Sequence, residues 1–249
     1  MLYIIGVGLK PEHLSIEAIE ALKECQEIFF EKYTSDFPEG SIKEIETLCG
    51  KKITELDRKK VEENFDFEKA KNKNIALLAI GNPFFATTHV QILLDAKEKG
   101  IEFKTIPGIS IQDFIGKTGL NAYRFGKTTS IVFRQPNYCP ESFYDSILSN
   151  SSNGLHSLCL LDITPEKKMN PREALELLLA IEKKRKKTII GKTTIVVMAA
   201  MGSSKEKIAF GKAKTLKEKE FPLPAALIVC AKLSEKELEA LKALAEEIK

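Results

Sequence analysis

Short apolar runs alternate with amphipathic stretches along most of this 249-residue chain, and the alternation predicts an α/β protein. The run Ile75–Ile80 is continuously apolar, as expected for a strand buried on both faces of a parallel sheet. Helices are expected to follow Ser15 and Ser234, whose hydroxyl groups can accept from the free N–H groups of a first turn. Pro171 also suits the start of a helix.

The same reading assigns every element by its residue range. Strands are predicted at Leu2–Val7, Glu27–Phe30, Lys52–Leu56, Ile75–Ile80, Glu102–Ile106, Ser130–Arg134, Ser157–Ile163, Thr194–Ala200, Lys207–Lys214 and Ala226–Ala231. Helices are predicted at 15–25, Ser41–Leu48, Arg58–Lys71, Thr87–Lys99, Glu141–Leu148, Pro171–Lys187 and Glu235–Ile248. Strands and helices alternate early and strands bunch late, so we expect two α/β domains, 1–110 and 111–249, with a mixed sheet in the second.

The charge and composition of the chain bear on whether it binds nucleic acid or a membrane. The chain has 38 basic and 35 acidic side chains, a balance that does not by itself suggest a nucleic-acid partner. The basic run Lys183–Lys187 lies at a predicted helix end, where the dipole favours cations; docking of an acidic partner or nucleic acid is the alternative. No apolar run approaches the ~18 residues needed to span a membrane, and the apolar start of the chain lacks the features of a signal peptide.

Cysteine and histidine usage points to a cytoplasmic protein without a metal. The five cysteines include no CxxC pair, so we expect reduced, structural thiols. The three histidines are far apart in the sequence, which makes a zinc or iron site unexpected.

The loops that follow the apolar runs are the candidate ligand sites, because open α/β sheets bind ligands beyond the carboxyl ends of their strands. The first loop, Gly6–Leu9, has two glycines that permit a tight turn, but Pro11 stands where a dinucleotide fingerprint needs a third. The second is Gly81–His89 and the third is Pro107–Ile111. Each of the three could equally be an ordinary turn.

Two further strand ends lie in the second half of the chain. Asp162 could orient a polar ligand, although a lone aspartate at a strand end more often satisfies a helix terminus. Met201 directly follows the apolar run Thr194–Ala200, so it too lies at the end of a predicted strand. No GxSxG, HExxH or Walker motif is present, so the residues alone predict a two-domain α/β ligand-binding enzyme.

Several segments, read together, resemble the diphthine synthases, a family of tetrapyrrole-methylase-like class III methyltransferases. The segments run in order along almost the whole chain, from Met1 to about Leu233. They are GVGLKPEHLSIEAIEALKEC at the start, EKYTS at 31–35, GNPFFATTH at 81–89, TGL at 118–120 with Tyr123 and FGK at 125–127, FYD at 143–145, HSL at 156–158, LDI at 161–163 and MNPREALELLL at 169–179.

The resemblance implies a homodimer of two α/β domains with S-adenosylmethionine in the cleft between them, and no metal. The positions that match the family's cofactor contacts are Leu9, Asn82, Phe85, Ser110, Ile111, Leu161, Met201 and Ala225. Substrate-side candidates are Tyr33, Thr34, Ser35 and Asp162. Two positions depart from the family pattern: Asn82 replaces the usual aspartate, and the histidine common near Ala225 is absent. An amide keeps hydrogen-bonding ability but loses a negative charge that could face a sulfonium.

The implied reaction is repeated methylation of an amino group on translation elongation factor 2. The acceptor is the 3-amino-3-carboxypropyl group of a modified histidine, the product is diphthine, the cofactor product is S-adenosylhomocysteine, and the pathway is diphthamide biosynthesis. Such a transfer depends mainly on positioning and desolvation, which agrees with the missing catalytic motif. The alternative is a methyltransferase of the same fold that acts on a corrinoid or other tetrapyrrole, or on ribosomal RNA.

Overall fold

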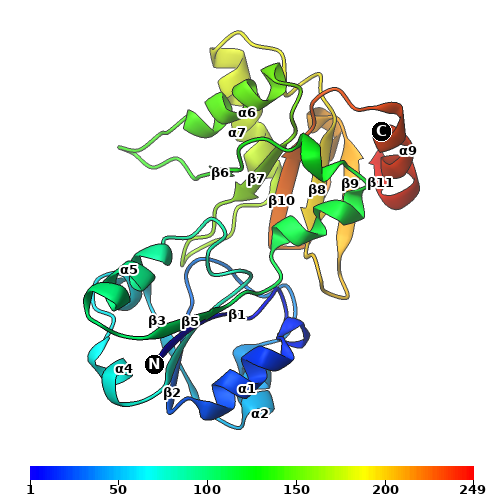
Figure 1. Ribbon diagram of the computed structural model, residues 1–249. Coiled ribbons are helices and arrows are strands. Elements are labelled where there is room, and N and C mark those ends of the chain that lie inside the picture. Colours follow the sequence, from blue (N-terminus) through cyan, green and yellow to red (C-terminus); the bar gives the residue numbers. More distant parts are fainter. The chain divides into compact units, whose positions relative to one another are not determined.

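The computed structural model describes residues 1–249, which form two compact units, Met1–Ile111 and Gln112–Lys249 (Figure 1). The first unit contains a five-stranded sheet in the order β3-β2-β4-β1-β5, and all of its strand pairs are parallel. Its strands are β1 (Leu2–Gly6), β2 (Glu27–Glu31), β3 (Ile53–Leu56), β4 (Ile75–Ala79) and β5 (Phe103–Ile106). Its helices are η1 (Pro11–His13), α1 (Ile16–Glu24), α2 (Ile42–Cys49), α3 (Arg58–Glu62), α4 (Glu68–Asn72) and α5 (Val90–Glu98).

Helices cover both faces of this sheet. Side chains along β1 alternate between the two faces, and each set packs against a different group of helices. Tyr3 and Ile5 pack in one core cluster with the buried residues of α1 and α2. Leu2 and Ile4 pack in a second cluster with buried residues of α3, α4 and α5. The central strands β1 and β4 are therefore buried on both faces, as the continuous apolar run of β4 predicts.

The second unit contains a six-stranded mixed sheet in the order β11-β9-β8-β10-β7-β6. Its strands are β6 (Thr129–Ile131), β7 (Ser157–Leu161), β8 (Ile195–Ala199), β9 (Lys207–Gly211), β10 (Ala225–Val229) and β11 (Glu246–Ile248). Its helices are η2 (Ile111–Thr118, which begins at the unit boundary), η3 (Ala122–Arg124), α6 (Ser142–Ser152), α7 (Pro171–Lys184), α8 (Ala213–Leu216) and α9 (Glu235–Leu244). The antiparallel pairs β7·β10, β8·β10 and β8·β9 make this sheet mixed, which confirms the predicted fold class.

Several element predictions differ from the structure; for example, the strand expected over Ser130–Arg134 is the shorter β6, which ends at Ile131. The helix expected over Arg58–Lys71 is two short helices, α3 and α4, and Phe65 and Phe67 between them pack edge to face with ring centroids 5.1 Å apart. The strand expected over Lys207–Lys214 ends at Gly211 and is followed by α8. The last helix ends at Leu244, after which β11 pairs with the free edge of β9 and buries Ile248.

The expected helix starts are confirmed. The Ser15 hydroxyl accepts from the backbone N–H of Ala18, 3.1 Å away. Asn170 and Glu173 form a capping box in front of Pro171 and α7. Ser234 and Glu237 form a second capping box at α9. No helix of the structure is both long enough and apolar enough to cross a membrane.

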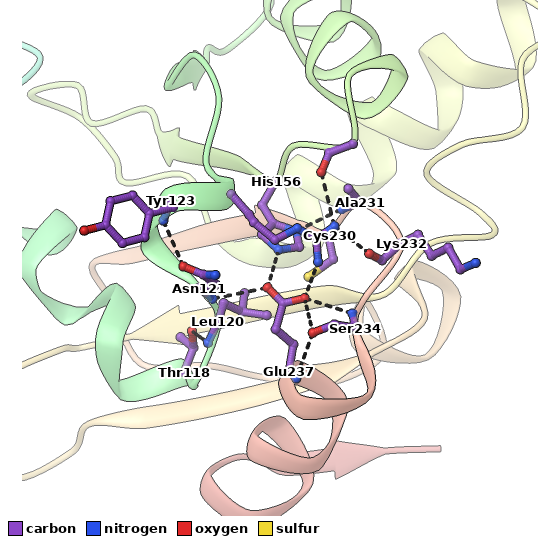
Figure 2. A network of polar contacts seen from close by, with 12 residues as sticks. Thr118, Leu120, Asn121, Tyr123, His156, Cys230, Ala231, Lys232, Ser234 and Glu237 are labelled. Atoms are coloured by element: carbon purple, nitrogen blue, oxygen red, sulfur yellow. Dashed lines mark hydrogen bonds and ion pairs between the residues drawn. The ribbon is translucent and has the colours of Figure 1, made fainter.

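A buried carboxylate, Glu237, anchors the start of the second unit to α9 (Figure 2). It accepts hydrogen bonds from the backbone N–H groups of Ser234 (2.9 Å) and Asn121 (3.2 Å), and from the guanidinium of Arg124. The imidazole of His156 adds a further bond of 3.0 Å from Nε2. His156 is fully buried, and its Nδ1 accepts from the backbone N–H of Ala231 at 3.0 Å. Nε2 therefore carries the proton and donates to Glu237.

The protonation states follow from these contacts. Burial raises the pKa of Glu237, but the hydrogen bonds from Ser234, His156 and Asn121 outweigh burial and hold the pKa at about 2. Burial lowers the pKa of His156, more than its bond to Glu237 raises it. At neutral pH the pair is thus a carboxylate that accepts from a neutral imidazole, and Arg124 supplies the positive charge.

This network predicts an acid-sensitive contribution to stability. Because the pKa of Glu237 is about 2 in the folded chain against 4.5 in the unfolded chain, ionised Glu237 contributes about 3 kcal/mol above pH 4.5. That contribution is lost as the pH falls from 4.5 toward 2. Urea unfolding of the wild type and of Glu237→Gln should differ by about this amount at pH 7. The difference should shrink below pH 4.5.

A matched control is Glu235→Gln, which neutralises an exposed carboxylate on the same helix. It should change the free energy of unfolding by no more than about 0.5 kcal/mol at either pH. Equal effects of the two substitutions would contradict the role assigned to Glu237.

Candidate functional site

Three loops meet at the carboxyl edge of the first sheet, because β4, β1 and β5 are neighbours and parallel. The backbone N–H of Val7 donates to Ala79 O at 2.9 Å, which continues the β1·β4 pairing beyond the strands. Gly8 and Gly81 then form an antiparallel bridge, with N···O distances of 2.9 Å from Gly81 to Gly8 and 3.4 Å in the other direction. The loops after β1 and β4 are therefore joined by backbone hydrogen bonds.

Glycines allow these loops to pack backbone against backbone. A Cβ atom at Gly6 would lie closer than 3.0 Å to the backbone of Gly108 and Gly81, and a Cβ at Gly108 would lie that close to Gly81 and Gly6. No side chain fits at either position without moving a neighbouring loop. From the sequence, Gly6 and Gly8 were predicted only to permit a tight turn. The structure shows that Gly6 and Gly108 determine how closely the three loops approach one another.

Gly81 differs from Gly6 and Gly108 in its surroundings. Its φ of +76° is in the left-handed region, and a Cβ built there would approach nothing closer than 3.9 Å. The nearest atoms would be Leu9 Cδ2 and the Cα and Cβ of Ser110. Gly81 is buried, and Leu9 and Ser110, two of the predicted cofactor residues, thus lie at van der Waals distance from the position that its Cβ would take.

Asn82 and Phe85 lie in the turn that follows Gly81. Asn82 Oδ1 accepts from the N–H of Phe84 at 3.0 Å, and the Asn82 carbonyl accepts from the N–H of Phe85 at 3.1 Å. Ala86 has a φ of +57°, an uncommon conformation for a residue with a side chain. Both Asn82 and Phe85 are half-buried. Ile111, also half-buried, begins η2 directly after Ser110.

The predicted substrate-side residues Tyr33, Thr34 and Ser35 follow β2, which pairs with β4. Glu31, at the end of β2, is 1% exposed and accepts from the N–H groups of Tyr33 (3.2 Å) and Thr34 (3.1 Å) and from the Thr34 hydroxyl. Burial raises the pKa of Glu31, and these hydrogen bonds lower it in part. The Thr34 hydroxyl is therefore engaged in holding its own loop.

In the second unit, strand pairing brings together three predicted cofactor residues. Ala225 pairs with Ala199 at the end of β8, and the next residue along β10, Ala226, pairs with Leu160. Leu161 therefore lies at the same end of the sheet as Ala225, and Met201 follows β8 there. All three are buried, with 8%, 9% and 2% exposure for Leu161, Ala225 and Met201 respectively.

Asp162 has a clear structural contact. Its Oδ2 accepts from the backbone N–H of Phe133 at 2.9 Å, and its own N–H donates to Ile131 O at 3.1 Å. These bonds tie the end of β7 to the segment after β6. No helix terminus is involved, so the carboxylate stabilises the backbone between neighbouring strands.

The basic run Lys183–Lys187 begins within α7, which ends at Lys184. Lys184 and Arg185 form ion pairs with Glu141, at 2.9 and 2.7 Å. These two charges are engaged within the unit rather than presented together. Across the chain, the structure holds no group of three or more His, Cys, Asp or Glu side chains that could bind a metal ion.

Sequence reasoning did not single out two buried residues of the first unit, Glu31 and His89, although both lie in the segments quoted for the resemblance. The signal that distinguishes them is burial of a polar side chain, with 1% exposure for each. Burial of this kind depends on which strands are neighbours, and the sequence alone does not reveal the order of strands in the sheet.

Comparisons with known proteins agree with this architecture. The profile of the tetrapyrrole (corrin/porphyrin) methylases matches residues 1–217. The chain is 44% identical to the diphthine synthase of Methanococcus aeolicus over 255 aligned residues, which cover 100% of this chain and 99% of that protein. It is 42% identical to the diphthine synthase of Methanocaldococcus jannaschii, with all of both chains covered. A crystal structure of a diphthine synthase superposes with a TM-score of 0.89 and 34% identity, covering 99% of this chain and 97% of that one.

Proposed function

Since this chain belongs to the diphthine synthases of the tetrapyrrole methylase family, we propose that it methylates the modified histidine of elongation factor 2. Membership of the family makes the chain an S-adenosylmethionine-dependent methyltransferase. The proposed acceptor is the amino group of the 3-amino-3-carboxypropyl side chain, methylated repeatedly until it becomes the trimethylammonium of diphthine. The observation that carries the proposal is full-length identity of 42–44% to curated diphthine synthases.

The loops of the first unit have the features that such a cofactor needs. Leu9 and Ser110 lie at van der Waals distance from the Cβ position of the buried Gly81, so these two proposed contacts are neighbours at one edge of the sheet. Leu9 and Phe85 offer apolar surface, and the Asn82 amide can hydrogen-bond. We therefore propose that Leu9, Asn82, Phe85, Ser110 and Ile111 hold S-adenosylmethionine from this unit. Leu161, Met201 and Ala225 would contribute from the second unit.

When bound, S-adenosylmethionine supplies an electrophilic methyl carbon on a positively charged sulfur. The residues of the chain have a simpler task, which is to align an uncharged amine behind that carbon and to exclude water. The proposed substrate side is the loop after β2, with Tyr33, Thr34 and Ser35, together with Asp162. The Thr34 hydroxyl donates a hydrogen bond to Glu31, so both groups are engaged in holding this loop in place and neither is free to act as a base. We propose that the enzyme works as a cytoplasmic homodimer.

The test is methyl transfer from S-adenosylmethionine to elongation factor 2 that carries the precursor side chain, read by intact mass. We expect that protein to gain one to three methyl masses, and elongation factor 2 with an unmodified histidine to gain none. A corrinoid precursor and ribosomal RNA serve as competing acceptors. Transfer to either of them, with none to elongation factor 2, would overturn the proposed substrate and leave the family assignment in place.

Asn82, where the family usually has an aspartate, leads to a separate prediction about the effect of a negative charge on cofactor binding. An aspartate at this position keeps the acceptor for the Phe84 N–H and adds a negative charge. We expect Asn82→Asp to tighten binding of S-adenosylmethionine about fivefold and to leave S-adenosylhomocysteine, which lacks the sulfonium charge, unchanged within about twofold. Calorimetric titration with both ligands at low salt measures the difference.

Asn72→Asp provides the control, because Asn72 is exposed at the end of α4 and precedes β4 on the opposite edge of the sheet. It should leave both affinities unchanged. Equal changes for the two ligands in Asn82→Asp would show that the side chain does not face the sulfonium.

A further inference from the structure

The loops after β2 and β4 contact each other through two aromatic side chains. Tyr33 belongs to the first loop and His89 to the end of the second, and their strands are neighbours in the sheet. Their ring centroids are 6.4 Å apart, with planes at 73°, an edge-to-face contact. The proposed substrate loop and the proposed cofactor loop are thus joined at one point.

His89 is 1% exposed and its two ring nitrogens have different surroundings. Nδ1 lies 3.0 Å from the carbonyl oxygen of Pro83, which can only accept, so Nδ1 carries the proton. Burial lowers the pKa of the imidazole, which keeps it neutral and leaves Nε2 as an acceptor. Nε2 is buried, and no protein group lies within hydrogen-bond distance of it.

Tyr33 presents the complementary case. Its hydroxyl is buried and also has no hydrogen-bond partner in the protein. Burial, and then the negative charge of Glu31, raise its pKa well above the usual value, so the hydroxyl keeps its proton. Arg58 lies over the Tyr33 ring, 4.9 Å from its centroid, and helps to fix the ring in place.

Buried polar atoms without a partner are rare in folded proteins. Only three side-chain atoms of this chain are in that position, and two of them, Tyr33 Oη and His89 Nε2, belong to rings in contact. A common partner must donate to Nε2 and accept from the tyrosine hydroxyl. A water molecule does both.

We propose that Tyr33 and His89 bind one buried water between the loops after β2 and β4, and that His89 is a positioning residue for the cofactor loop. The Pro83 carbonyl accepts from the His89 imidazole and from the Thr87 hydroxyl, and these bonds close the loop around Ala86, which has a left-handed backbone. Asn82 and Phe85 lie in the same loop. Through the water, the loop that contains Tyr33 therefore helps to fix the positions of Asn82 and Phe85. The importance of this for cofactor binding rests on the proposed function.

The test is a double-mutant cycle that removes one partner at a time. Tyr33→Phe keeps the ring and removes the hydroxyl. His89→Asn keeps a donor near Nδ1 for the Pro83 carbonyl and removes Nε2. Each single variant leaves the other ligand of the water unpaired, whereas the double variant removes both ligands, so its loss of stability to urea should be smaller than the sum of the two single losses. Independent roles would give additive losses, and that result would overturn the shared water.

The positioning role has its own readout in the affinity for S-adenosylhomocysteine. We expect each single variant to raise the Kd about fivefold. His89→Leu, which also releases Pro83, should raise it further than His89→Asn. The control is Tyr3→Phe, a tyrosine on β1 in the opposite core cluster, which should leave the Kd unchanged. An unchanged Kd in all His89 variants would reduce His89 to a structural role and overturn the positioning claim.

A crystal structure of the wild-type chain at high resolution tests the water directly. Electron density within hydrogen-bond distance of both Tyr33 Oη and His89 Nε2 is expected. A dry contact would contradict the proposal. Neither this structure nor the affinity for S-adenosylhomocysteine involves elongation factor 2, so failure of the proposed methyl acceptor would be seen separately.

Discussion

The close approach of three backbone segments at Gly6, Gly81 and Gly108 is the constraint on which the candidate site depends. Parallel pairing of β4, β1 and β5 brings their following loops to one edge, but only residues without Cβ atoms let those loops touch. The result is a tightly packed and largely buried junction of three loops, with Leu9 and Ser110 beside Gly81. The cofactor site proposed on these loops would offer mainly main-chain groups, which agrees with the absence of a catalytic motif in the sequence.

Buried carboxylates fix the loops of both units, and their pKa values shift in opposite directions. Glu31 accepts only from neutral donors, namely two backbone N–H groups and a hydroxyl, and its pKa is raised by burial. Glu237 accepts from backbone N–H groups too, but Arg124 and His156 also donate to it, and its pKa falls to about 2. Burial therefore outweighs the hydrogen bonds at Glu31 and raises its pKa, whereas the hydrogen bonds outweigh burial at Glu237 and lower its pKa.

The sequence predicted most strands because apolar runs between turn residues are a local signal. It predicted Ile75–Ile80 within one residue of β4, and it placed the capped starts of α1, α7 and α9 correctly. It missed β11, because an exposed pair of glutamates before Ile248 continues a helical pattern and pairs only with the distant edge of β9. The site residues came from resemblance, since single loops are indistinguishable from turns. The pairing of Tyr33 with His89 depends on the order of strands in the sheet, which no local pattern encodes.

Calorimetric titrations with S-adenosylmethionine that compare Gly81→Ala with Gly100→Ala test whether the cofactor lies against the loops after β1, β4 and β5. Both glycines have a left-handed backbone, and an added Cβ at either one meets no atom closer than 3.9 Å, so the two variants should lose about the same stability, roughly 1 kcal/mol. Gly100 follows α5, whereas a methyl group at Gly81 would lie at van der Waals distance from Leu9 and Ser110, two of the proposed cofactor residues. We predict that Gly81→Ala weakens binding at least about tenfold while Gly100→Ala binds like the wild type. Equal affinities in the two variants would contradict the account, because the cofactor would then lie elsewhere.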